Sequence, residues 1–397
     1  MKIIIIVGGK FHAFNLAREI NKKKYLASII TSYPKYLVKQ YGIDTNRIKS
    51  IILKEILLKI FNKFSYLKNF FDSDTYLSNY FSKKASKLIN YDDVDIIIGW
   101  SSFSREAFIK AKGYNCLKIL ERGSTHILYQ AEILKKEYSE LQIKPLVPSQ
   151  EIINKELEEY KLADYISVPS EFVKKTFLIN GIDEKKIIKI PYGVDLEEFK
   201  IMNYQNRDKH KFKIISVGSI SIRKGSHYLL KAFKELNLSN AELVFIGPIE
   251  NDFKKIIKNF KNINNIKFIK KQKQSNLKSF YNNADIFVQC SIEEGLAVVQ
   301  LQAMACGLPV ICTENTGGAE IVDDGVNGFV IPIKNIDILK EKILYLYNNN
   351  NKLKEMSLNA HEKAQSNLSW ENYGNKIINT YLKLFNHHKN EKNSSSN

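Results

Sequence analysis

Two adjacent cations, Arg223 and Lys224, stand directly before Gly225 in a turn that joins an apolar run to a helical pattern. The same turn begins with Gly218 and Ser219, so it combines small residues, a hydroxyl and two positive charges. Free N–H groups at the start of a helix favour anions, and neighbouring cations strengthen that preference. The pattern fits a diphosphate-binding turn, although a solvated turn would also contain such residues.

Glu294 stands in a later turn, before a helix that we expect to begin near Val298 and to end at Gly307, with Pro309 beyond. Ligands of parallel α/β sheets bind at the carboxyl ends of the strands, and Glu294 would face that edge. Gln302 follows about two helical turns later, on roughly the same helix face. An ordinary buried helix with a polar first turn would give the same spacing.

Weaker candidates lie in the first third of the chain. Gly8 and Gly9 follow the first apolar run, where glycine lets the backbone approach a ligand, but they do not form a G-x-G-x-x-G fingerprint. His126 follows an apolar run that ends at Glu121, and its ring either lines a site or is satisfied inside the protein. His12 fits a helix-start residue better than a residue that contacts a ligand.

Short apolar runs alternate with helical patterns along the whole chain, which indicates parallel α/β architecture. The expected strands are Lys2–Val7, Leu26–Thr31, Val94–Trp100, Leu117–Glu121, Tyr165–Val168, Ile187–Ile190, Phe212–Val217, Glu242–Ile246, Ile266–Ile269, Ala284–Gln289, Pro309–Cys312 and Gly328–Ile331. At 397 residues the chain exceeds the usual size of one core. We predict two doubly wound domains, 1–205 and 206–370, a helix at 371–386 that crosses back to the first domain, and a disordered tail at 387–397.

The composition limits the kinds of ligand and partner that the chain is expected to bind. The four cysteines are scattered without CxxC pairs or Cys/His ligand spacing, so we expect neither disulfides nor a zinc site, and no apolar run is long enough to span a membrane. The net charge of +18 calls for an anionic partner. We do not expect nucleic acid, because no RNA- or DNA-binding signature is present.

The basic, aromatic-rich segment 35–91 contains a long helical pattern at Ile48–Phe64. Its lysines either lie at an anionic membrane surface or are solvated on ordinary core helices, and the sequence leaves both open. These lysines are Lys49, Lys54, Lys59, Lys63 and Lys68.

Several motifs occur together in a fixed order: Pro191–Asp195, Arg223–Gly225, Glu294–Val310, and Gly317-Gly318 with Glu320. In this combination the chain resembles the nucleotide-sugar-dependent glycosyltransferases of family 4, which have the GT-B fold. The resemblance is specific over Asp164–Pro332 and weak over the first 160 residues. It implies two Rossmann-like domains facing across a cleft, with the donor held mainly by the second.

The resemblance also implies roles for single residues. Lys224 matches a lysine that contacts the donor diphosphate, and Glu294 matches a glutamate near the donor sugar. Ser219 replaces a family arginine, whose charge Arg223 would supply, and Gln302 replaces a glutamate that accepts from the ribose. His126 would lie near the sugar on the acceptor side. We thus expect Glu294, His126 and Lys224 to be catalytic, and the donor to be lined by Gly8, Gly9, Gly218, Ser219, Arg223, Lys224, Gly295, Leu296, Ala297, Val298 and Gln302.

The implied activity is a retaining sugar transfer, hexosyltransferase-like, from a UDP- or GDP-linked donor to a glycan, lipid-linked or polysaccharide acceptor. The resemblance implies neither a cofactor nor a metal, and we expect a cytoplasmic protein, peripheral at the inner face of the membrane. Two alternatives remain open: a nucleotide-sugar epimerase or hydrolase of the same fold, and a non-catalytic anion- or membrane-binding protein.

Overall fold

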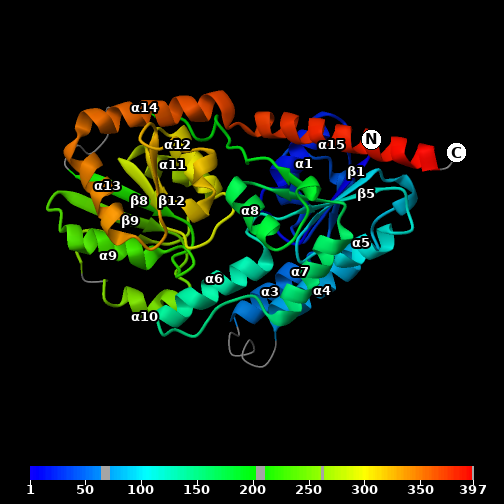
Figure 1. The fold of residues 1–397 in the computed structure, drawn as a ribbon, viewed down its shortest axis with the longest axis horizontal. Coiled ribbons are helices and arrows are strands. Elements are labelled where there is room, and N and C mark those ends of the chain that lie inside the picture. The colour runs from blue at the N-terminus through cyan, green and yellow to red at the C-terminus, as the bar shows by residue number, and fades with distance from the viewer. Residues whose placement is uncertain (64–71, 203–210, 261–262, 396–397) are drawn as a thin grey trace.

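The computed structural model describes residues 1–63, 72–202, 211–260 and 263–395, which form two α/β halves joined side by side (Figure 1). The first half is built on one seven-stranded parallel sheet in the order β3-β2-β1-β4-β5-β6-β7. Its strands are β1 (Ile3–Val7), β2 (Leu26–Thr31), β3 (Ile48–Ser50), β4 (Ile96–Trp100), β5 (Leu117–Glu121), β6 (Tyr165–Val168) and β7 (Ile187–Lys189).

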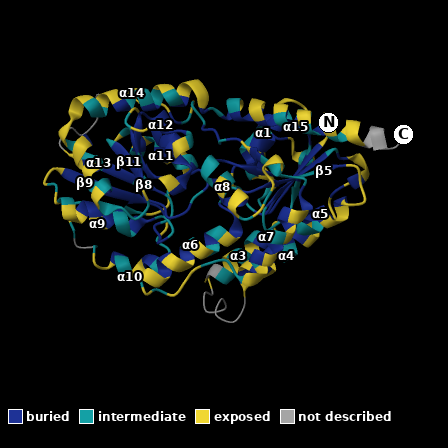
Figure 2. Cartoon of the chain, in the orientation of Figure 1, coloured by how far each residue is buried: buried dark blue, intermediate teal, exposed yellow. Residues whose placement is uncertain are grey.

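Helices cover both faces of this sheet, as buried isoleucine-rich parallel strands require. They are α1 (Ala13–Lys22), α2 (Lys35–Lys39), α3 (Leu53–Lys63), α4 (Ser73–Ser86), α5 (Arg105–Ala111), α6 (Ile127–Glu140), α7 (Gln150–Leu162) and α8 (Glu171–Ile179). Figure 2 shows the strands of both sheets buried and the outward faces of the helices exposed.

The second half contains a six-stranded parallel sheet in the order β10-β9-β8-β11-β12-β13. Its strands are β8 (Phe212–Val217), β9 (Ala241–Ile246), β10 (Ile266–Ile269), β11 (Ile286–Gln289), β12 (Val310–Thr313) and β13 (Gly328–Ile331). Its helices are α9 (Ser226–Leu236), α10 (Lys254–Ile257), α11 (Gln274–Asn282), α12 (Val298–Ala305), α13 (Ile336–Asn348) and α14 (Asn350–Asn367). Both strand orders reverse beside the first strand of their sheet, which is the doubly wound arrangement.

The last helix, α15 (Trp370–Ser395), leaves the second half and runs along the first (Figure 1). Its Gly374 packs so tightly on α1 that an added Cβ would overlap the side chain of Glu19. The Tyr381 hydroxyl donates to the Glu121 carboxylate over 3.2 Å. The chain therefore connects the two halves twice, first between β7 and β8 and again through α15.

Helix α6 joins the halves a third time, because its first residue, Ile127, belongs to the hydrophobic core of the first half while its later turns pack on the second half. Leu134 and Tyr138 belong to the hydrophobic core of the second half. The Tyr138 hydroxyl donates to Asp252 over 2.6 Å. Glu137, fully buried, accepts from Tyr228 over 2.9 Å and pairs with Lys334.

The predicted fold class, two Rossmann-like α/β domains, is confirmed, and each of the twelve expected strands is present within about two residues of its predicted bounds. The helical prediction for Ile48–Phe64 is wrong at its start: Ile48–Ser50 forms the edge strand β3, and α3 begins at Leu53. Phe64 and the boundary predicted between 205 and 206 lie outside the described residues.

The disordered tail predicted from 387 is wrong up to Ser395, because α15 continues to that residue. Its polar composition gave no apolar stripe to indicate a helix beyond Phe385. Across the described parts of the chain, no helix is both long and apolar enough to cross a bilayer.

Candidate functional site

The cationic turn lies at the carboxyl end of β8, directly before α9. Gly218 has a φ of 137° and Gly225 a φ of 62°, a region of backbone space that glycine enters without strain. A Cβ on Gly225 would also overlap the Cys290 carbonyl, so glycine is required there. The turn closes through a hydrogen bond from the Lys224 backbone N–H to the Ser221 hydroxyl over 3.3 Å. This local geometry fixes the backbone from which the two cations extend.

Glu294 meets these cations from the carboxyl end of β11. Its carboxylate contacts the Lys224 ammonium and lies 3.9 Å from a terminal guanidinium nitrogen of Arg223. Its backbone N–H donates to the Asn315 carbonyl over 2.8 Å, which anchors the Glu294 turn on the turn after β12. The structure therefore brings together three of the residues that the sequence singles out, at one edge of one sheet.

Burial, and next the positive charge of Arg223, lower the pKa of Lys224 to about 7. The negative charge of Glu293 raises the pKa of Lys224, and the Glu294 carboxylate that contacts the ammonium also favours the protonated lysine. The protonation state of Lys224 therefore depends on the anion that contacts its ammonium group.

Glu293, which the sequence did not single out, is the most deeply buried carboxylate of this region. It pairs with Nε of Arg223 over 2.9 Å and accepts from the Thr125 hydroxyl over 2.7 Å and from the Gln130 amide over 2.8 Å. Burial alone would raise the pKa of Glu293, but Arg223 and the hydrogen bonds from Thr125 and Gln130 lower it to about 2. Only the Glu293-Glu294 doublet beside Gly295 signalled it, and a doublet does not tell which carboxylate points inward.

The remaining donor-side candidates differ in burial. Gln302 is buried, and its amide oxygen accepts from the Tyr281 hydroxyl over 3.1 Å. Leu296 and Ala297 are also buried, whereas Val298 and Ser219 are partly exposed. In this structure the Gln302 side chain is therefore hydrogen-bonded to a residue of the second half. Among the described interactions, it makes no contact with Glu294.

Gly8 and Gly9 form a tight turn after β1. A Cβ on Gly8 would overlap the ring of Phe103, and the Gly8 carbonyl accepts from the Lys54 ammonium over 2.8 Å. The Gly9 carbonyl accepts from the Thr31 hydroxyl over 3.1 Å. Their described contacts all lie within the first half.

Among the described interactions, the side chain of His126 contacts neither Glu294 nor Arg223 and Lys224. Its side chain caps α6 by accepting from the Leu128 N–H over 3.4 Å, and its ring packs between Tyr160 and Phe177 at 5.0 Å from each. Only 2% of the residue is exposed. Burial, and next the charge of Arg122, lower its pKa to about 4.

His12 is also buried. It lies 3.2 Å from the Glu121 carboxylate, with its ring 4.1 Å from that of Tyr192.

The two halves touch directly at the site. A Cβ on Gly295 would overlap the carbonyl of Gly123, so the turn after β11 lies against the turn after β5. The Ser170 hydroxyl donates to the Gly295 carbonyl over 2.8 Å. Beside it, Glu320 accepts from the Lys189 ammonium over 3.0 Å. Any ligand of Glu294 and Lys224 would therefore bind where the halves meet.

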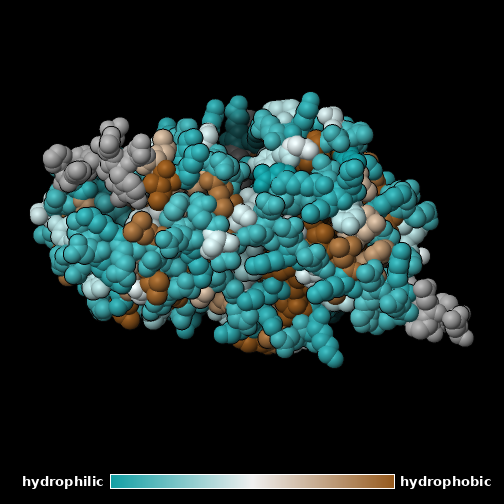
Figure 3. All heavy atoms as spheres, turned by 90° about the horizontal axis from the view of Figure 1, so that it is seen from above, coloured by the Kyte–Doolittle hydropathy of each residue, from teal (hydrophilic) through white to brown (hydrophobic). Residues whose placement is uncertain are grey.

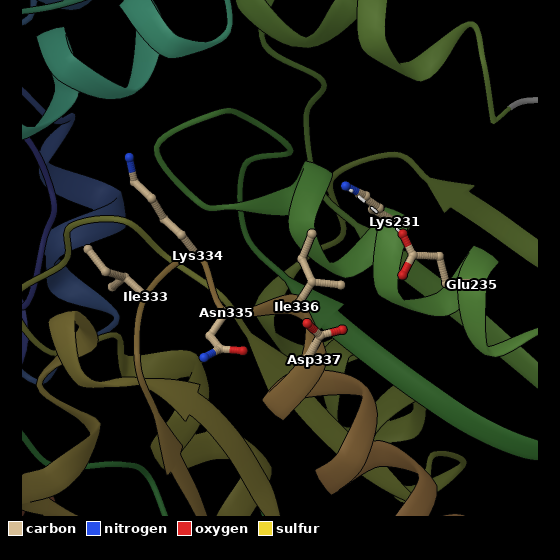
Figure 4. Close-up of a pocket in the computed structure, with 7 residues that line it drawn as sticks. All are labelled: Lys231, Glu235, Ile333, Lys334, Asn335, Ile336 and Asp337. Carbon is tan, nitrogen blue, oxygen red and sulfur yellow. Dashed lines mark ion pairs between the residues drawn. The ribbon is translucent and has the colours of Figure 1, made fainter.

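A separate polar hollow lies between α9 and the start of α13 (Figure 4). Its charged lining includes Lys231, Glu235, Lys334 and Asp337, none of which is a predicted site residue. Lys334 pairs with Glu140 of α6 over 2.6 Å, so this hollow borders α6 and not the cationic turn.

The fold is similar to that of solved structures. Over 96% of its length the structure matches all of a structure of Anabaena HepE in complex with UDP, with a TM-score of 0.68 and 17% identity. It matches sucrose-phosphate synthase from Thermosynechococcus elongatus over 98% of this chain and all of that one, with a TM-score of 0.69 and 16% identity. The chain has the GT-B fold.

Within this GT-B chain, residues 197–363 match the family model described as "Glycosyl transferases group 1". The chain is 30% identical over 236 residues to an uncharacterized glycosyltransferase of Methanocaldococcus jannaschii, which covers 57% of this chain and 59% of that relative. It is 29% identical over 243 residues to the capsular polysaccharide biosynthesis glycosyltransferase CapM of Staphylococcus aureus, over 55% of this chain and 62% of the relative. The chain thus spans about three fifths of the length of these curated relatives.

The buried ring of His126 generates a prediction for the pH dependence of stability. Between pH values near 6.5 and 4, the unfolded chain binds a proton that the folded chain does not, so stability falls as the pH falls through this window. We expect wild type to lose up to about 3 kcal/mol more than His126→Asn between pH 7 and pH 4. Urea unfolding at several pH values measures this difference. His387→Asn, at an exposed position on α15, should follow wild type; parallel curves for wild type and His126→Asn would contradict the prediction.

Proposed function

We propose that the protein transfers a sugar from a nucleoside-diphosphate sugar, UDP-linked in the first instance, to a glycan or polysaccharide acceptor, with retention of configuration. The observation that carries this proposal is the convergence of Lys224, Arg223 and Glu294 at the contact between the two halves of a GT-B fold. The group 1 match of residues 197–363 and the relative CapM support a glycosyltransferase activity. The UDP and UDP-glucose complexes of Anabaena HepE support the choice of nucleotide.

The cationic turn would bind the diphosphate. Lys224 now has Glu294 as its counterion, so a diphosphate would replace that carboxylate as the partner of the ammonium. Two phosphates carry more charge than one carboxylate and favour protonated Lys224, whose pKa is about 7. Glu294, released from Lys224, would then face the donor sugar.

In the proposed reaction the bond between the anomeric carbon and the leaving phosphate oxygen breaks first. Lys224 and Arg223 stabilise the negative charge on the departing diphosphate, and Glu294 stabilises the positive charge at the anomeric carbon. The acceptor hydroxyl attacks on the face from which the diphosphate leaves, and its proton passes to the departing phosphate oxygen. We propose that these cations replace a metal ion in this step.

His126 has a different part in this proposal from the one its sequence position suggests. Its ring is enclosed by Tyr160 and Phe177 and caps α6. We therefore propose that it holds the start of α6, close to Ser124 and Thr125, and does not touch the sugar.

We further propose that the protein acts in the cytoplasm at an anionic membrane surface. Helix α3 exposes an apolar face, on which Leu53 is 47%, Ile56 49% and Ile60 43% exposed, beside the exposed Lys59. An amphipathic face with nearby lysines fits an anionic bilayer surface. The face that carries α14 and α15 is mostly hydrophilic, with apolar residues in small groups (Figure 3).

The donor site is tested by thermal unfolding of the protein with UDP, GDP, ADP or CDP in the presence of a chelator. We expect UDP at about a hundred times its Kd to stabilise the protein by roughly 2.7 kcal/mol, a rise of several degrees in Tm. Lys224→Ala should abolish this rise, and Lys354→Ala, on the exposed face of α14, should keep it. If none of the four nucleotides stabilises wild type, a non-catalytic anion binder becomes the better description.

Glu294 is tested by turnover. We expect Glu294→Gln to lower the rate of UDP release from UDP-glucose about a hundredfold or more, since it removes the charge that stabilises the anomeric centre. The Tm rise with UDP should persist in this variant. Oligosaccharide fragments should accelerate UDP release by wild type; an equal rate without any acceptor would indicate a hydrolase or an epimerase instead.

The membrane proposal is tested by sedimentation with vesicles of phosphatidylglycerol and phosphatidylcholine. We expect Leu53→Glu to reduce binding severalfold, because it places a charge in the apolar face of α3. Leu358→Glu on α14, where Leu358 is 59% exposed, is the matched control and should bind like wild type. Equal loss in both variants, or no binding by wild type, would overturn the proposed surface.

A further inference from the structure

The guanidinium of Arg223, one of the two proposed diphosphate cations, is held from two sides. Its Nε donates to Glu293 over 2.9 Å, within the second half of the chain. One terminal nitrogen donates to the Ser124 hydroxyl over 2.7 Å, and Ser124 belongs to the turn after β5 in the first half. The position of this cation therefore depends on both halves.

Glu293 depends on both halves in the same way. Besides Arg223, its carboxylate accepts from the Thr125 backbone N–H over 3.0 Å, the Thr125 hydroxyl over 2.7 Å and the Gln130 amide over 2.8 Å. A carboxylate without access to water is stable only when donors replace its hydration. Three of its four hydrogen bonds come from Thr125 and Gln130, in the turn after β5 and the start of α6, so moving this segment away from the turn after β11 would leave Glu293 with Arg223 alone.

The donors from the first half are themselves fixed. Arg122 donates to the Gln130 amide oxygen over 3.1 Å and to the Thr125 carbonyl over 2.9 Å. Arg122 is paired with Glu156 of α7 over 2.8 Å. Gln130 and Thr125 are therefore both held by Arg122 at the positions from which they donate to Glu293.

We propose that Glu293 is a positioning residue that orients Arg223 toward the donor diphosphate when the two halves are in contact. This inference rests on the proposed function, since it assigns Arg223 to the diphosphate. Contact between Gly123 and Gly295 brings Thr125 and Gln130 to Glu293, and Glu293 in turn holds Nε of Arg223 beside Lys224. The acceptor-side half thereby controls a cation of the donor site without touching the donor.

A purely architectural ion pair makes a different prediction. If Glu293 only stabilised the contact between the halves, its neutral variant would unfold at a lower temperature and weaken every ligand alike. If Glu293 positions Arg223, the neutral variant weakens ligands that contain a diphosphate and spares the bare nucleoside, because Arg223 acts on phosphate oxygens alone.

The test compares UDP with uridine on wild type and Glu293→Gln by calorimetry and ligand-observed NMR. We expect the Kd for UDP to rise about tenfold while the Kd for uridine stays within about twofold. Glu341→Gln, an exposed glutamate on α13, should leave both affinities unchanged. Thr125→Val, which removes one hydroxyl donor to Glu293 and keeps the shape of the side chain, should weaken UDP severalfold and also spare uridine.

The outcomes separate the two proposals. Unchanged UDP affinity in Glu293→Gln, or an equal loss for UDP and uridine, overturns the role of Glu293 and leaves the proposed function intact. Failure of wild type to bind UDP overturns the proposed function and the role of Glu293 with it. If Glu293→Gln does not fold, the Thr125→Val variant decides in the same way: loss confined to UDP supports positioning, and an unchanged or uniform response overturns it.

Discussion

A carboxylate that has lost all contact with water must find its hydrogen-bond donors in the protein, and Glu293 finds them in both halves of the chain. Its stability as an ion is possible only while the turn after β5 lies against the turn after β11. That contact also places Gly123 on Gly295 and fixes Arg223 next to Lys224. The geometry of the site is thus a consequence of one buried negative charge and the donors that surround it.

The site itself is a balance of charges at the edge of a parallel sheet. Lys224 and Glu294 neutralise each other, and Arg223 is neutralised by Glu293. An incoming polyanion can take over Lys224 from Glu294, which is partly exposed, but cannot displace Glu293, which is enclosed. The two adjacent glutamates have the same side chain but differ in burial and in their partners, Arg223 with the donors of the turn after β5 for Glu293 and Lys224 for Glu294.

The sequence predicted the strands well because their apolar runs are short and β-branched and alternate with helical patterns, which favours buried parallel strands over buried helices. It failed at Ile48–Ser50, since a three-residue edge strand is too short to interrupt the helical spacing that follows it. Turn position and charge singled out Lys224 and Glu294 as candidates, and the structure brings these two side chains into contact. The sequence could not identify Glu293, the buried cap formed by His126, or the contact of Gln302 with Tyr281, because these depend on side-chain direction and on contacts between distant segments.

Helix α6 has a consequence for the modularity of the chain. Two Rossmann-like units suggest two domains that could be exchanged between related proteins, with the junction of the chimera placed between the two sheets. Leu134 and Tyr138, however, precede that junction in the sequence and complete the hydrophobic core that lies beyond it. If the second half were expressed or transplanted alone, its hydrophobic core would lack Leu134 and Tyr138. In the first half alone, the apolar residues of α6 that pack on the second half would have no partner. A functional chimera would therefore have to inherit α6 together with the half that it packs against, so the natural unit of exchange is discontinuous in sequence.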